Sequence, residues 1–86
     1  MYLKNHRKLY EELNSILEKL LFGIDTYYSK DLVLNSEGMK LLSRAIRIIN
    51  TLYPQLRFLI NEVRADPTYN VIIKLVSRIK ELIEPS

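Results

Sequence analysis

The residue types that carry out most enzyme chemistry are scarce in this chain. It contains one histidine, His6, no cysteine, and two glycines, Gly23 and Gly38, that stand far apart. One imidazole supplies neither a histidine metal pair nor a serine–histidine arrangement, and isolated glycines do not form a phosphate-binding loop. The adjacent Glu11 and Glu12 would point to different faces of a helix. We therefore expect a protein that is not an enzyme, with no cofactor and no metal site.

Basic residues in the middle of the chain are the clearest candidates for polar binding. Between Glu37 and Glu62 the chain has four basic residues and no acidic one. Three of the four are spaced i, i+4, i+7, so a helix would present them as one stripe. The candidates are Lys40, Arg44, Arg47 and Arg57. We predict that they contact nucleic-acid phosphates independently of sequence, or else an acidic protein surface. A solvated cationic face without a ligand is the third interpretation.

The element that must position this stripe is a central helix. Apolar residues recur there in alternating steps of three and four, which is the spacing of a helix packed against other helices. They are Met39, Leu42, Ile46, Ile49, Tyr53, Leu56, Ile60 and Val63. We predict a helix over about residues 37–65, with Asn35 or Ser36 as its N-cap.

Pro54 falls in the middle of this predicted helix. Proline removes one backbone hydrogen bond and its ring clashes with the preceding turn. The apolar spacing continues through it, from Ile49 and Tyr53 to Leu56, so we predict a kink rather than an end. The alternative is a true break at Pro54, which would give four helices.

Two further helices are predicted on either side of the central one. A seven-residue repeat of apolar residues predicts the first over about residues 3–27, with Gly23 near its end. Asp66 followed by Pro67 is typical of a helix start, so the last is predicted over about residues 67–84. The fold class is therefore all-α, an antiparallel bundle of three long helices, in a single domain that spans residues 1–86.

The lengths of these helices predict an apolar surface at one end of the bundle. The last helix is too short to reach the place where the first helix ends and the central one begins, although this place is apolar. Residues 32–34 would fold back over part of it. The candidate interface residues are Phe22, Ile24, Tyr27, Tyr28, Met39 and Leu41. Exposed apolar surface on a folded domain is typical of a contact with another protein, or with a second copy in a homodimer.

Composition is consistent with a small globular protein. The chain has 86 residues, 48% of them hydrophobic, and a net charge of +3. It lacks the roughly 20 unbroken apolar residues of a membrane span, and its first residues soon turn polar, so we expect no membrane contact and a cytoplasmic location. The single glutamine and the many Ile, Leu, Lys, Arg and Glu residues resemble the composition of thermophile proteins.

The leading functional interpretation is a protein–protein interaction module, a small accessory or adaptor subunit of a larger complex. No motif identifies a family, although small helical accessory subunits of archaeal replication complexes are similar to the chain in size and composition. A DNA replication or other nucleic-acid-processing assembly is therefore one example of such a complex. The alternatives are a nucleic-acid-binding protein that uses the basic stripe, and a small viral or plasmid-encoded regulator of a host protein.

Overall fold

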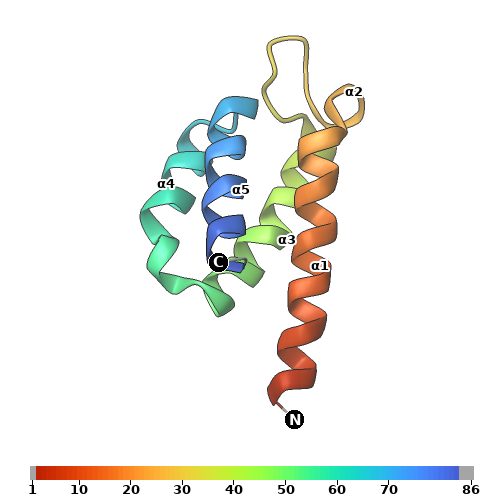
Figure 1. The fold of residues 1–86 in the computed structure, drawn as a ribbon. Coiled ribbons are helices and arrows are strands. Elements are labelled where there is room, and N and C mark those ends of the chain that lie inside the picture. Colours follow the sequence, from red (N-terminus) through yellow and green to blue (C-terminus); the bar gives the residue numbers. More distant parts are fainter. Residues whose placement is uncertain (1, 84–86) are drawn as a thin grey trace.

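The computed structural model describes residues 2–83, with side chains from Arg7 to Leu82. The helices, shown in Figure 1, are α1 (Tyr2–Phe22), α2 (Ile24–Tyr27), α3 (Ser36–Leu52), α4 (Arg57–Ala65) and α5 (Tyr69–Ile83), with a 3-10 turn, η1 (Pro54–Leu56), before α4. Residues 2–83 form helices, turns and two isolated backbone bridges but no strand, so the all-α class is confirmed. The predicted helix end at residue 84 lies outside the described residues.

The predicted continuous helix over residues 37–65 is wrong, and the alternative with a break at Pro54 describes the chain. Tyr53 leaves the helical conformation (φ −136°, ψ 63°), and η1 separates it from α4. Proline lacks the N–H that a continuing helix needs. Tyr53 and Leu56 are both buried, one on each side of the break, which explains why the apolar spacing continues through it. The described chain thus has four long helices instead of three.

The first helix ends earlier than predicted, at Phe22. Gly23 (φ −100°, ψ 43°) interrupts it, and the four residues of α2 follow. The N–H of Gly23 still donates to the carbonyl of Lys19 over 2.8 Å. A Cβ atom on residue 23 would lie 2.6 Å from that same carbonyl oxygen. Glycine is therefore required where the chain turns from α1 into α2.

Backbone hydrogen bonds hold the connection from residue 28 to residue 35. The N–H of Leu34 donates to the carbonyl of Pro67 (3.0 Å), and the N–H of Tyr69 donates to the carbonyl of Leu32 (2.9 Å). These bonds join the connection to the start of α5. Leu34 is buried whereas Leu32 is exposed, so the predicted folding of residues 32–34 onto the core is correct for Leu34 and wrong for Leu32.

One predicted helix cap is confirmed and one is wrong. The Oδ1 atom of Asn35 accepts from the N–H of Gly38 (2.9 Å), and its Nδ2 atom donates to the carbonyl of Thr26 (2.9 Å). Asn35 therefore caps α3 and also ties it to α2. Asp66, in contrast, is the C-cap of α4. Helix α5 begins only at Tyr69, after Thr68, whose Oγ1 atom lies 3.5 Å from the N–H of Val71.

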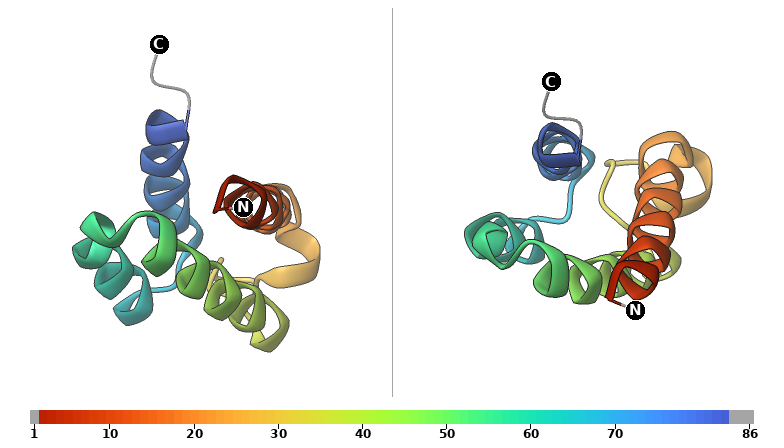
Figure 2. Two further views of the ribbon diagram at one scale, coloured as in Figure 1. Left: turned by 90° about the horizontal axis from the view of Figure 1, so that it is seen from below. Right: turned by 60° about the horizontal axis from the view of Figure 1, so that its bottom comes forward.

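The four long helices surround one core, with α5 packed against both α1 and α4. Figure 2 shows this arrangement from below. The hydroxyl of Tyr69 donates to the carbonyl of Leu21 (2.8 Å), so the start of α5 covers the end of α1. The sequence predicted no third helix at this place. The break at Pro54 is the cause, because it lets α4 turn back and bring α5 alongside α1.

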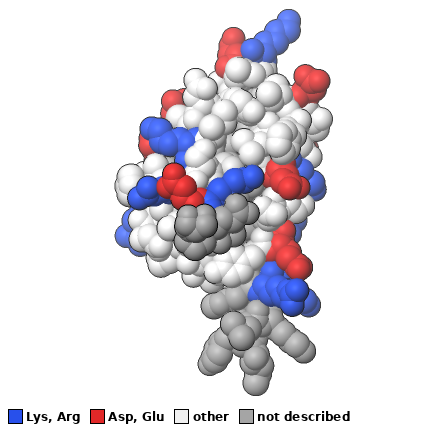
Figure 3. Space-filling model, viewed as in Figure 1, with Lys and Arg blue, Asp and Glu red and all other residues white. Residues whose placement is uncertain are grey.

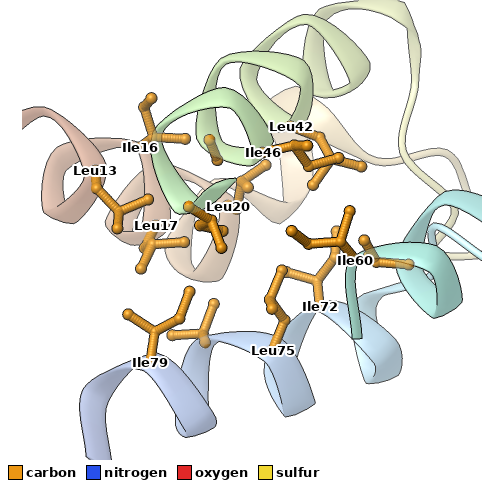
Figure 4. Close-up of a cluster of buried hydrophobic side chains, with 14 of the residues drawn as sticks. Leu13, Ile16, Leu17, Leu20, Leu42, Ile46, Ile60, Ile72, Leu75 and Ile79 are labelled. Atoms are coloured by element: carbon orange, nitrogen blue, oxygen red, sulfur yellow. The ribbon is translucent and has the colours of Figure 1, made fainter. Parts of the chain in front are cut away.

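Apolar side chains from α1, α3, α4 and α5 meet in the core, as Figure 4 shows for Leu17, Ile46, Ile60 and Ile79. Burial of a leucine or isoleucine side chain contributes about 1.5–3 kcal/mol, so this contact among four helices is the main source of stability. None of the helices in the described part of the chain is long and apolar enough to cross a lipid bilayer.

Candidate binding surfaces

Three of the predicted interface residues are exposed at one end of the bundle, which we call the apolar end and define by Phe22, Ile24 and Met39. Phe22 is 79% exposed, and Ile24 and Met39 are each 37% exposed. They come from three successive elements, because Phe22 ends α1, Ile24 begins α2 and Met39 lies in the first turns of α3. Helix α2 packs against both α1 and α3, so these three elements meet at one end of the bundle.

The other predicted interface residues lie deeper. Tyr27 and Leu41 are half-buried and pack against the core. Tyr28 is buried, its hydroxyl donates to the carbonyl of Leu20 (2.7 Å), and its ring meets that of Tyr69 edge to face at 5.3 Å. Burial, and then the neighbouring Tyr69, raise the pKa of the Tyr28 phenol. The accessible surface at this end therefore does not include Tyr28.

Leu32 is an exposed apolar residue that the sequence did not reveal. Its side chain is 41% exposed, and its backbone is in the left-handed conformation (φ 62°). For a leucine this conformation is strained by about 1–3 kcal/mol. The hydrogen bond from Tyr69 to the carbonyl of Leu32 holds it there. The sequence shows only an apolar run at 32–34, which gives no sign of which side chain turns outward.

The predicted basic stripe divides into residues with and without an acidic neighbour. The Nζ atom of Lys40 lies 3.4 Å from a carboxylate oxygen of Glu37. The guanidinium of Arg44 forms an ion pair with Glu12 of α1. Arg47 and Arg57 are both exposed, and neither forms an ion pair with any residue whose side chain is described. Arg44 and Lys40 are therefore already neutralised, whereas Arg47 and Arg57 remain available.

A third arginine, Arg64, lies with Arg47 and Arg57 between α3 and α4. Two adjoining hollows lie there, and both are lined by Asn50 and Arg64. Arg47 lines the first and Arg57 the second. We call the two together the arginine groove. Arg57 and Arg64 are seven residues apart on α4, a spacing that indicates one helical face. The sequence analysis missed Arg64 because it considered only the stretch between Glu37 and Glu62, and Arg64 lies just beyond Glu62.

The opposite side of the molecule has a different charge pattern. Acidic and basic side chains are interspersed over the face of α1 and α5, as Figure 3 shows. Lys74 pairs with Glu62 (2.9 Å) and Arg78 with Glu81 (3.3 Å). A hollow between α4 and α5 lies beside these pairs, next to Phe58, which is 65% exposed. Both cations that line this hollow are paired, so it lacks the unpaired arginines found between α3 and α4.

Among the residues that the structure describes, no three His, Cys, Asp or Glu side chains come close enough to hold a metal ion. The side chain of His6 lies outside the described residues. Burial, followed by the hydroxyl of the neighbouring Tyr10, raises the pKa of Tyr53 to about 12.

Comparison with known proteins does not identify a relative, since no protein-family model, curated protein or solved structure matches the chain.

Proposed function

We propose that this chain is a non-enzymatic protein–protein interaction module, a small accessory or adaptor subunit that contacts its partner, or a second copy of itself, through the apolar end. Phe22, Ile24 and Met39 form the contact surface, with Tyr27 and Leu41 behind them. In this assignment the four-helix core is a scaffold, and the surface residues carry the function.

The observation that supports this proposal most strongly is the exposure of Phe22. Its ring is 79% exposed although a phenylalanine ring gains about 1.5–3 kcal/mol from burial. The core does not need it, since Leu17 and Leu20 of α1 fill the interior. Aromatic side chains and methionine are enriched in protein interfaces. Ile24 and Met39 add exposed apolar surface at this end of the bundle, and the strained, exposed Leu32 lies in the connection between α2 and α3.

Phe58 provides a matched control, because it is the other strongly exposed phenylalanine. It is 65% exposed and lies on α4, away from the apolar end. We expect Phe22→Ser to weaken partner binding or self-association by about 30-fold, the loss typical of an interface hot spot. Phe58→Ser should leave it unchanged. Both substitutions remove an exposed ring, so each should change the free energy of unfolding by about 0.5 kcal/mol or less.

Light scattering of the purified protein measures self-association, and co-purification from native extract measures binding to another protein. The proposal is wrong if Phe58→Ser removes the association while Phe22→Ser keeps it, since the contact would then be at the hollow between α4 and α5. It is equally wrong if both variants associate like the unmodified chain.

A further inference from the structure

The arginine groove places hydrogen-bond donors on two facing walls. Helix α3 supplies Ser43, Arg47 and Asn50, which are spaced i, i+4, i+7, and α4 supplies Arg57, Asn61 and Arg64 with the same spacing. This spacing puts each set in one row along its helix. All six side chains are exposed, and none donates or accepts a hydrogen bond within the described part of the chain. Their donors are therefore free for a ligand.

The charge of the groove selects an anion. Its polar lining consists of three arginines, two asparagines and one serine, with Met39 and Pro54 beside them and no carboxylate from the described residues. Arginine presents several N–H groups in a planar fork that matches phosphate oxygens, and asparagine and serine side chains also contact phosphates in nucleic-acid complexes. Buried Leu42, Ile46 and Ile60 form the floor of the groove, so the polar side chains lie next to well-packed apolar residues.

The length of the groove fits a ligand with several phosphates. Arg57 and Arg64 are separated by seven residues, which is about 10 Å along a helix. Phosphates on one strand of B-DNA advance by about 3.4 Å each, so this distance covers about three nucleotides. A single small anion would occupy one of the two hollows and leave an arginine unpaired. A nucleic-acid backbone can occupy both.

The residues of the groove also indicate which form of nucleic acid it fits. Proteins that hold single strands stack bases on aromatic side chains. The hollows have no aromatic lining among the residues described, and Phe58 of α4 lines the separate hollow beside α5. Aromatic side chains are likewise enriched at contacts with proteins. A lining without aromatic side chains from the described residues therefore favours the outer phosphate backbone of a duplex over a single strand or a protein surface.

We propose that the arginine groove between α3 and α4 is a binding site for the phosphate backbone of double-stranded nucleic acid, contacted by Arg47, Arg57 and Arg64 with Asn50 and Asn61. The groove adjoins the apolar end at Met39, which also lines its first hollow, whereas Phe22 and Ile24 line neither hollow. Recognition is independent of base sequence, since the groove contacts phosphates alone.

The test is fluorescence anisotropy with a labelled DNA duplex of about 20 base pairs. Three phosphate contacts predict a slope of about −2.7 for the logarithm of affinity against the logarithm of salt concentration. Affinity should therefore fall about 40-fold when salt is raised fourfold. The triple variant R47Q/R57Q/R64Q should lose this salt dependence and bind at least about tenfold more weakly.

A control variant separates the groove from the overall charge. K8Q/K30Q/K80Q removes three positive charges from exposed sites elsewhere, so both triple variants change the net charge from +3 to 0. The control should keep the salt slope of the unmodified chain. Equal losses of affinity and salt slope in the two variants would mean that net charge alone attracts DNA. The assignment of the binding site to the groove would then be wrong.

Three other outcomes would also overturn the proposal. The first is no binding of the duplex at low salt. The second is tighter binding of the single strand than of the duplex. The third is equal competition by poly-glutamate, which would indicate an acidic protein surface as the ligand. The single substitution Asn61→Asp places a carboxylate in the groove without removing an arginine, and it should weaken binding even if the triple variant folds poorly. Neither groove variant should change the association that Phe22→Ser removes.

Discussion

Two sides of α3 carry similar residues but have different electrostatic environments. The hollow toward α1 is lined by Glu12, Arg44 and Arg47, and the carboxylate of Glu12 pairs with Arg44. The groove toward α4 is lined by Arg47, Arg57 and Arg64, with no acidic side chain from the described residues. Arg47 lies on the ridge between the two sides and lines both. One helix therefore presents a neutralised cation on one side and an available cation on the other.

The difference shows that the neighbours of a helix, more than its own sequence, determine which charges can bind. Arg44 and Arg47 are three residues apart on α3, and a helical projection treats them alike. Helix α1 brings a carboxylate to one of them, whereas α4 brings two more guanidinium groups to the other. The exposed like charges on the α4 side cost some stability, as expected where a surface is kept available for an anion.

The largest expected effect comes from disturbing the rotation of α3, on which this difference depends. In Gly38→Ala the new Cβ would lie 2.5 Å from the carbonyl oxygen of Tyr27 and 2.5 Å from Cδ2 of Leu34. We expect a loss of about 1–3 kcal/mol in the free energy of unfolding. Urea denaturation measures it. Alanine is favoured over glycine inside a helix by about 1 kcal/mol, so a loss of stability would be due to the clash of the new Cβ atom with Tyr27 and Leu34.

Ser43→Ala is the control for this change, since Ser43 is an exposed residue of the same helix. It should alter the free energy of unfolding by about 0.5 kcal/mol or less. A Gly38→Ala variant that is as stable as the unmodified chain would show that α3 can shift at its start. The positions of Arg44 and Arg47 would then be less firmly set than the structure indicates.

A smaller effect is expected at alkaline pH, at the joint between α3 and α4. The pKa of Tyr53 is about 12 in the folded chain and near 10 when unfolded. The folded state binds the phenol proton of Tyr53 more tightly than the unfolded state does. The contribution of Tyr53 to the free energy of unfolding is therefore fully present below about pH 10 and is lost as pH rises toward 12. Between about pH 9 and about pH 11 the loss from Tyr53 is about 1 kcal/mol.

Urea denaturation at the two pH values checks this expectation. Tyr53→Phe should lose about 1 kcal/mol less than the unmodified chain over the same interval. It should still lose some stability, because burial and Tyr69 also raise the pKa of Tyr28. Equal losses in the two proteins would mean that Tyr53 is accessible to water in the folded chain.

The smallest stability effect should come from Glu12→Gln, which makes the α1 side resemble the α4 side. The Arg44–Glu12 pair is partly exposed, with 66% of the arginine side chain and 38% of the glutamate side chain accessible. Its loss should therefore cost no more than about 1 kcal/mol at low salt and less at high salt. The freed Arg44 should steepen the salt slope of duplex binding by up to about 0.9. A lower affinity of Glu12→Gln for the duplex would contradict the conclusion that Glu12 makes Arg44 unavailable to an anion.

Much of the fold could be predicted from the sequence, because the apolar spacing is regular. The spacing located the helices on both sides of Pro54, and Asn35 was one of two predicted caps for α3. It could not show whether Pro54 bends or breaks a helix, because Tyr53 and Leu56 remain in phase in either case. The contact of α5 with α1 follows from the break and joins residues far apart in the sequence. The burial of Tyr28 and the outward turn of Leu32 depend on the same tertiary contact, through Tyr69.

The candidate sites were predicted less completely for the same reason. Arg47 and Arg57 were found from the absence of acidic residues between Glu37 and Glu62. Arg64 follows Glu62 and so lay outside that stretch, although its seven-residue spacing from Arg57 places both on one helical face. The pairing of Arg44 with Glu12 joins residues 32 positions apart, and no local pattern indicates it. Phe22 was found because the helix lengths indicated an apolar end, and it lies there in the structure.

The most direct test of the difference between the two sides of α3 is a titration of the protein with duplex DNA, followed through the arginine Nε–H signals in nuclear magnetic resonance spectra. The signals of Arg47, Arg57 and Arg64 should shift together as the duplex is added, whereas those of Arg44 and Arg78 should stay in place. Equal shifts at Arg44, or no shift at the three groove arginines, would contradict the assignment of the anion site to the α4 side.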